Sequence, residues 1–156
     1  LAANTVPVTA GAAAATGLNV EKLILARELL GAAEVDLTIE MPRIATSQKQ
    51  ISDMLRQTEV TNGDYAALKR LESGEVDTFM GFKFLRSERL PLDASGYPRC
   101  PFWVPSGVHV SYPNGRKTRS GERAGKKYLT QGFMAGTIGG TRTQEKKVGE
   151  ILCAFS

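Results

Sequence analysis

The spacing of apolar residues changes along the chain, and this change most constrains the fold. In the first half, apolar residues recur at helical intervals, as in the segments that begin at Val20 and at Ile51. In the second half they alternate, as at Met80, Phe82 and Phe84, which is typical of a strand with one buried face. Helices followed by strands predict a mixed α+β fold.

Two helix starts and one short strand are indicated in the first part of the chain. Asn19 is a predicted N-cap, and the wide apolar set that follows it predicts a helix buried on more than one side. A stop is predicted at Gly31 or in the acidic stretch 34–36. After a short strand at 43–46, Ser47 and Gln50 have the spacing of a capping box and predict a second helix.

Later elements are indicated by turn signals and by alternation. Residues 61–64 predict the start of a third helix, and Gly74 its end. A strand is expected over 78–86, because its apolar residues share one face. Further short strands are predicted at 102–104 and 108–110, a turn at 112–115, and longer strands at 127–137 and 147–155.

Few residues are available for metal or redox chemistry. Cys100 and Cys153 match no metal-ligand spacing, so we expect them to be buried small hydrophobes in a reducing cell. His109 is the only histidine, which excludes a catalytic histidine network. We therefore predict no enzyme activity, no cofactor and no metal. No apolar run approaches the roughly 18 residues of a membrane span.

Charge is distributed unevenly along the 156 residues. The net charge of +4 divides into −4 for residues 1–78, with 7 basic and 11 acidic groups, and +8 for residues 79–156, with 13 basic and 5 acidic groups. Such segregation is expected of a protein that binds a polyanion, of a chain whose copies meet acidic face to basic face, or of two solvated faces.

The densest charge lies in the segment 116–127, which we interpret as a basic loop. Six basic residues and one acid suit contacts to nucleic-acid phosphates. No aromatic residue interleaves them, so a solvated loop or a contact with another subunit is at least as well supported. Its G-x-x-x-G-K run is too short for a phosphate-binding loop. The basic residues are Arg116, Lys117, Arg119, Arg123, Lys126 and Lys127.

Two groups of mixed charge beside apolar strands are candidates for subunit contacts. One is formed by Arg86, Glu88 and Arg89, and the other by Arg142 and Glu145. Exposed ion pairs contribute only about 0–1 kcal/mol each. Repeated over a symmetric assembly, such pairs can nevertheless specify its geometry.

Several blocks resemble the major capsid proteins of tailed bacteriophages. They are Ile51–Leu55, Glu59–Tyr65, Gly74–Pro91 and Gly139–Cys153, and the similarity runs from about Asn19 to the end of the chain. The resemblance implies an HK97-like capsid fold, with an axial domain and a peripheral domain that contains a long spine helix and a long-stranded sheet. The basic segment 116–127 departs from the family pattern, in which charge is more mixed.

The resemblance also implies a division of the chain. Residues 1–18 would be an N-terminal segment, 19–42 and 111–156 would belong to the peripheral domain, and 43–110 to the axial domain. The extended arm and the long hairpin (E-loop) of the family are not in the sequence, and the chain begins at Leu1. We therefore interpret it as the C-terminal part of a capsid subunit.

The expected function is self-assembly into an icosahedral shell around phage DNA. The expected partners are copies of the same chain in hexamers and pentamers, packaged double-stranded DNA, and scaffolding, portal or decoration proteins, with no membrane. The subunit would assemble in the host cytoplasm and reside in the virion. A nucleic-acid-binding module that uses the basic second half, or an encapsulin-like compartment shell, are the alternatives.

Overall fold

A computed structural model describes residues 4–55, 70, 73–74, 77–112, 115–127 and 129–154. The chain forms two compact units, one of residues 1–108 with 143–156 and one of residues 109–142. We call the first the sheet unit and the second the ribbon. Most of the predicted third helix, over 61–74, lies outside the described residues.

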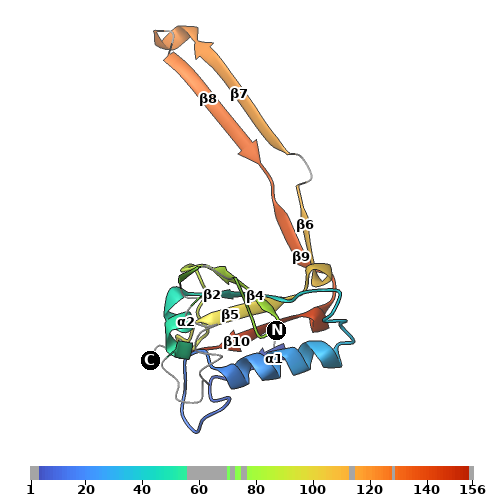
Figure 1. The fold of residues 1–156 in the computed structure, drawn as a ribbon. Helices are drawn as coiled ribbons and strands as arrows, with labels where there is room; N and C mark the ends of the chain where they lie inside the picture. The colour runs from blue at the N-terminus through green and yellow to red at the C-terminus, as the bar shows by residue number, and fades with distance from the viewer. Residues whose placement is uncertain are drawn as a thin grey trace. The chain divides into compact units, whose positions relative to one another are not determined.

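A six-stranded mixed sheet forms the centre of the sheet unit (Figure 1). Its strand order is β1-β10-β5-β2-β4-β3. The pairs β1–β10 and β2–β4 are parallel, and the remaining neighbours are antiparallel. The strands are β1 (Thr5–Val6), β2 (Arg43–Thr46), β3 (Thr78–Phe79), β4 (Phe82–Arg86), β5 (Arg99–Trp103) and β10 (Val148–Leu152).

Helix α1 (Val20–Ala32) lies along one face of this sheet (Figure 1). As predicted, Asn19 caps it: the Asn19 side chain accepts a hydrogen bond of 2.7 Å from the backbone N–H of Lys22. The helix continues past Gly31 and ends where Glu34 adopts a left-handed φ of 57°. Its buried face consists of Lys22, Leu23, Ala26 and Leu30.

Helix α2 (Gln48–Leu55) starts at the predicted capping box, but the box is only half formed. The Ser47 hydroxyl accepts a hydrogen bond of 3.4 Å from the Gln50 backbone N–H. The Gln50 side chain does not accept the hydrogen bond from the Ser47 backbone N–H that would complete the box. Instead its Oε1 accepts from the backbone N–H of Leu18 at 2.9 Å, in the interior. The competing donor is a buried backbone group, whose desolvation would be costly if it stayed unpaired.

The strand predicted over 78–86 is a tight hairpin instead. The chain turns at Met80 and Gly81, whose φ values are 49° and 79°, and Phe79 pairs with Phe82 across the turn. Phe82 and Phe84 are buried as predicted, whereas Met80 belongs to the turn and is only half-buried. Period-two spacing alone did not reveal the turn, because Gly81 allows a reversal without shifting the alternation.

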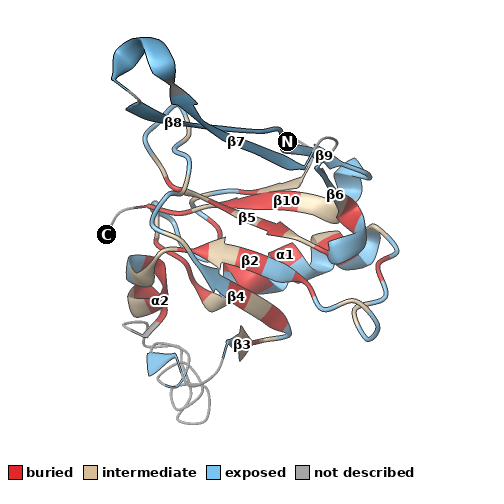
Figure 2. Ribbon diagram, turned by 90° about the horizontal axis from the view of Figure 1, so that it is seen from above, coloured by how far each residue is buried: buried red, intermediate tan, exposed pale blue. Residues whose placement is uncertain are grey.

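The core fills the space between α1, α2 and the sheet. Buried residues lie on β10, β5, β2, β4 and both helices (Figure 2). Phe82 and Phe102 make an edge-to-face contact, with ring centroids 6.5 Å apart at 85°. Cys100 and Cys153 are both buried and unbridged, which confirms their predicted role as small core residues.

The ribbon is a long two-stranded antiparallel structure. Its base is the pair β6 (Val108–Ser111) and β9 (Gly139–Arg142), and its outer part is the pair β7 (Arg116–Arg123) and β8 (Leu129–Gly136). The predicted basic loop 116–127 is therefore mainly a strand. Among the described residues, η3 (Ala124–Lys126) and Lys127 form the hairpin tip.

The predicted division into an axial and a peripheral domain stays a prediction, and the two compact units follow other boundaries. Strand β10 is paired along its whole length with β5, so residues 148–152 share a sheet with 99–103, which the prediction placed in another domain. The short helices η2 (Pro105–Gly107) and η4 (Glu145–Lys147) stand at the two points where the chain leaves and re-enters the sheet unit.

Candidate assembly surfaces

The ribbon exposes nearly all of its surface, including large apolar side chains. Every ribbon residue whose burial is described is exposed. A two-stranded ribbon cannot form a core of its own, so its apolar side chains remain in water unless a partner covers them. The large apolar side chains concerned are Val110, Tyr112, Leu129, Phe133, Met134 and Ile138.

Strand register places basic and apolar residues directly opposite each other on one face. Lys117 pairs with Ala135, and Arg119 pairs with Phe133. Cross-strand partners lie on the same face of a sheet. The second half of the ribbon therefore supplies the aromatic residue that the basic segment itself lacks. Local sequence did not show this neighbour, because Phe133 is fourteen positions from Arg119.

A hollow of about 420 Å³ lies where the base pair of the ribbon, β6 and β9, meets its outer pair, β7 and β8. Tyr112, Thr137 and Ile138 line it together with Gly115, Arg116 and Gly136. The lining is mostly apolar, and Arg116 supplies its one charge. This hollow can receive an apolar side chain that is accompanied by an acidic group.

The six predicted basic residues are distributed along the ribbon. Arg116, Lys117 and Arg119 lie on β7 and are exposed. Arg123 closes the same strand, Lys126 lies in η3, and Lys127 adopts a left-handed φ of 52°. The whole ribbon carries seven basic groups and one acid, a net charge of +6. The sheet unit, with 13 basic and 15 acidic groups, carries −2.

The predicted interface group at the end of β4 is partly used within the subunit. Glu88 Oε1 accepts a hydrogen bond of 2.8 Å from the backbone N–H of Gln48, so it caps α2. Arg86 ends β4 opposite Thr46. Arg89 is exposed, and its backbone N–H donates to the Ser87 hydroxyl at 3.3 Å.

The second predicted group is divided between the two units. Arg142 is the last residue of β9, in the ribbon, and Glu145 opens η4, in the sheet unit. Both are exposed. The Glu145 carbonyl accepts a hydrogen bond of 2.9 Å from the Asn4 side chain, which ties the start of the described chain to η4.

The acidic segment between α1 and β2 was interpreted from the sequence only as a helix stop, and not as a candidate contact surface. Between Arg27 and Arg43 the chain carries four acids and no basic residue, which is the signal that identifies it. We call residues 34–41 the acidic loop. Ile39 in this loop is 80% exposed, more than any other large apolar side chain described in the sheet unit. The acidic loop thus combines negative charge with a protruding aliphatic group.

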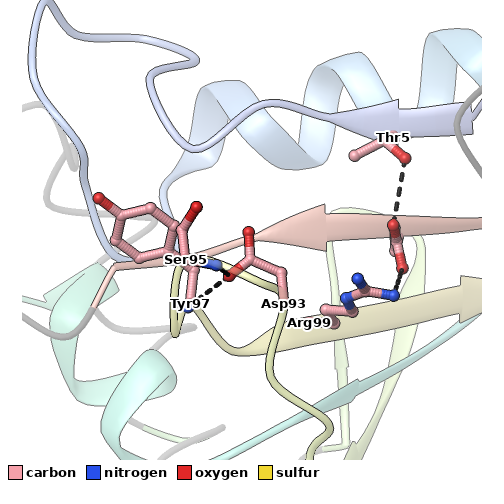
Figure 3. A network of polar contacts seen from close by, with 6 residues as sticks. Thr5, Asp93, Ser95, Tyr97 and Arg99 are labelled. Carbon is pink, nitrogen blue, oxygen red and sulfur yellow. Dashed lines mark hydrogen bonds and ion pairs between the residues drawn. The ribbon is translucent and has the colours of Figure 1, made fainter.

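A separate set of polar contacts joins strands of the central sheet and shapes one of its turns. Glu150 on β10 is buried, and its two carboxylate oxygens face different partners. Thr5 donates to Oε1 at 3.3 Å, and Arg99 pairs with Oε2 at 3.7 Å (Figure 3). Asp93 organises the turn before β5 by accepting from the backbone N–H groups of Ser95 and Tyr97 (Figure 3). The Glu150 contacts connect β1, β10 and β5, and the Asp93 contacts shape a turn, so both sets are structural.

Lys22 is a fully buried lysine that the apolar pattern of α1 did not predict. Its Nζ donates to the carbonyl oxygens of Thr16 at 2.7 Å, Gly17 at 2.9 Å and Leu152 at 3.0 Å. Removal from water lowers the pKa of this ammonium group. Three carbonyls use all three of its donors, which is an arrangement for holding chain segments together.

Neither a metal centre nor a membrane span is found in the part of the chain that the structure describes. No group of three or more histidine, cysteine or acidic residues is placed there to hold a metal ion. Among the same residues, no helix has the length and apolarity needed to cross a bilayer.

Comparison with known proteins identifies the family. A family model described as phage capsid protein matches residues 1–155. The chain therefore belongs to the phage capsid protein family, as the sequence blocks predicted. No curated protein matches the sequence.

Solved phage structures share the fold. A structure from Mycobacterium phage Che8 matches 87% of the chain with a TM-score of 0.64 at 12% identity. The capsid structure of the Cyanophage P-SCSP1u matches 86% with a TM-score of 0.60 at 19% identity. The mature capsid of bacteriophage PhiM1 matches 81% with a TM-score of 0.53 at 11% identity.

These likenesses confirm the predicted α+β, HK97-like capsid fold. The chain spans 53%, 45% and 43% of the three matched chains, which is about half of their length.

Proposed function

We propose that this chain is part of a major capsid subunit that assembles with copies of itself into an icosahedral shell around packaged double-stranded DNA. The match of the phage capsid family over residues 1–155 carries the proposal. The subunit would be built in the host cytoplasm and would reside in the virion. Its role is structural, so we expect it to catalyse no reaction.

The exposed surface supports a protein that works by association. The ribbon presents apolar and basic side chains with no described residue over them, and the sheet unit has the opposite net charge. Surfaces of opposite sign steer copies together and fix their orientation, while apolar contacts supply most of the affinity. A shell multiplies such weak contacts by the number of its subunits.

Particle formation tests this function. The protein, with any further residues that its gene encodes, is expressed and measured by light scattering and negative-stain electron microscopy. We expect closed particles of uniform size. A monomer or small oligomer under conditions where the protein is folded would contradict the proposal.

The mixed-charge candidates enter this proposal as subunit contacts. Arg89 is the best single test, because its side chain is exposed and lies just beyond β4. We expect Arg89→Glu to reduce the yield of particles and to leave the unfolding midpoint of the subunit unchanged. Normal particles from this variant would remove Arg89 from the contact. Scaffolding, portal and decoration proteins are further proposed partners.

Nucleic-acid binding by the ribbon is the second candidate function. The cross-strand pair of Arg119 and Phe133 favours it, because a base can stack on the ring while the guanidinium contacts a phosphate. Binding of this kind weakens steeply with salt. A gel-shift assay with single- and double-stranded DNA, repeated between about 50 and 200 mM salt, distinguishes nucleic-acid binding from assembly.

A further inference from the structure

The hollow in the ribbon has an apolar lining with one arginine, and the acidic loop carries exposed apolar and acidic side chains. We propose that they bind each other between neighbouring copies of the chain, with Ile39 of one copy seated in the hollow of the next. The inference rests on the proposed function, since it names one contact by which subunits would assemble.

The lining of the hollow favours an apolar occupant. Tyr112 and Ile138, which line it, are each 66% exposed. Apolar surface of this kind is stabilised when another apolar group removes it from water. Its volume of about 420 Å³ is ample for an aliphatic side chain. Phosphate groups of DNA do not match a lining of this composition, so the hollow favours protein over nucleic acid as the occupant.

The acidic loop carries exposed apolar side chains that can fill the hollow. Ile39 is 80% exposed and Met41 is 50% exposed, so two apolar side chains project from one short segment. The loop is held in shape by its own contacts. Asp36 accepts hydrogen bonds from the Thr38 backbone N–H at 2.9 Å and from the Thr38 hydroxyl, and Glu40 accepts from the Ser106 hydroxyl at 2.7 Å.

Charge determines the orientation of the contact. Arg116 lies at the hollow, and Lys117 and Arg119 follow it on the same strand. The acidic loop carries Glu34 and Asp36, both exposed, ahead of Ile39. The hydrogen bonds from Thr38 lower the pKa of the Asp36 carboxyl, so it stays ionised at neutral pH.

A contact between different surfaces of identical chains can repeat around a ring. Because the hollow and the acidic loop are distinct patches, the interface is heterologous, and each subunit presents one patch to each of two neighbours. Closure of such contacts produces rings, which is the arrangement that the proposed hexamers and pentamers require.

Cross-linking tests the contact directly. Ile39→Cys and Ile138→Cys are made in separate copies of the complete protein and co-assembled, and the particles are oxidised and analysed on a non-reducing gel. The native Cys100 and Cys153 are buried, so they contribute little background. We expect a covalent dimer from the mixture that is at least tenfold more abundant than from either variant alone.

Leu92→Cys mixed with Ile138→Cys is the matched control, because Leu92 is also an exposed aliphatic residue, at 56%, outside both patches. Particles that give no dimer from the Ile39 pair, or as much dimer from the control pair, would overturn the inference and leave the proposed function intact. Absence of particles from the unaltered protein would instead count against the proposed function.

Charge exchange provides a second measurement that needs no cysteine. Arg116→Glu should lower the particle yield several-fold, and adding Glu34→Lys to the same chain should restore it. If Arg116→Glu leaves assembly unchanged, the inference is overturned, and particles emptied of DNA would then show that Arg116 contacts nucleic acid. Failure of the second change to restore assembly also counts against it.

Discussion

The Nζ atom of Lys22 lies 3.0 Å from the carbonyl oxygen of Leu152, although the two residues are 130 positions apart. The same ammonium group binds the carbonyls of Thr16 and Gly17, so one side chain joins the segment before α1, the helix itself and the end of β10. This contact helps to fix the C-terminal strand in the sheet.

Replacing Lys22 by methionine should destabilise the fold by about 2–3 kcal/mol, because buried carbonyls lose their donor while the side-chain volume is nearly kept. Chemical denaturation followed by circular dichroism measures the loss. Lys146→Met, at an exposed lysine of η4, is the control and should change stability by less than about 0.5 kcal/mol. Equal effects of the two substitutions would contradict the structural role of Lys22.

Gly149 should not tolerate a side chain. A Cβ atom there would lie 2.3 Å from Phe102 Cζ and 2.6 Å from the Asn4 carbonyl oxygen. We expect Gly149→Ala to cost about 1–3 kcal/mol through overpacking. Gly140→Ala, with no atom within 4 Å of the new Cβ, serves as the control in the same denaturation experiment. Part of the loss should be recovered by adding Phe102→Leu, which removes the clashing ring edge.

Stability should fall above pH 9 because of Cys100. Its thiol donates to Cys153 Sγ at 3.8 Å, and this contact together with burial raises the pKa of Cys100 above its ordinary value of 9.0. The unfolded chain loses this proton near pH 9.0 while the folded chain keeps it. The folded state then binds more protons, so stability decreases with rising pH by up to about 1.4 kcal/mol per pH unit.

Denaturation curves between pH 8 and pH 10.5 check this pH dependence. Cys100→Ala should have lower stability at pH 8 but a shallower decline above pH 9. Parallel declines in the two proteins would show that Cys100 is not the group responsible.

Glu88 should contribute to the stability of the single subunit. Its carboxylate caps α2 through the 2.8 Å bond from the Gln48 N–H, so Glu88→Ala should cost about 1 kcal/mol. Arg89→Ala, one residue further along, should be within about 0.5 kcal/mol of the parent. The test is thermal unfolding of a dissociated subunit. If Glu88→Ala affects particle yield alone, the capping role is wrong.

Local sequence determined those elements whose signals are themselves local. Asn19 capped its helix as predicted, because a cap needs only the backbone N–H groups three residues ahead. The strand at 43–46 and the buried Phe82 and Phe84 also followed from local pattern. The capsid family was identified in the same way, from blocks of residues in a fixed order.

Contacts between segments far apart in the sequence determined the features that local sequence did not predict. The basic segment 116–127 became a strand only because residues 129–136 pair with it, and this pairing supplied Phe133 as a neighbour. The Gln50 side chain accepts a hydrogen bond from the buried N–H of Leu18 instead of completing the capping box. Lys22 is buried because it donates to carbonyl groups that include that of the distant Leu152. Propensity and spacing describe each residue against its near neighbours. Burial and hydrogen-bond satisfaction depend on segments that meet only when the chain has folded.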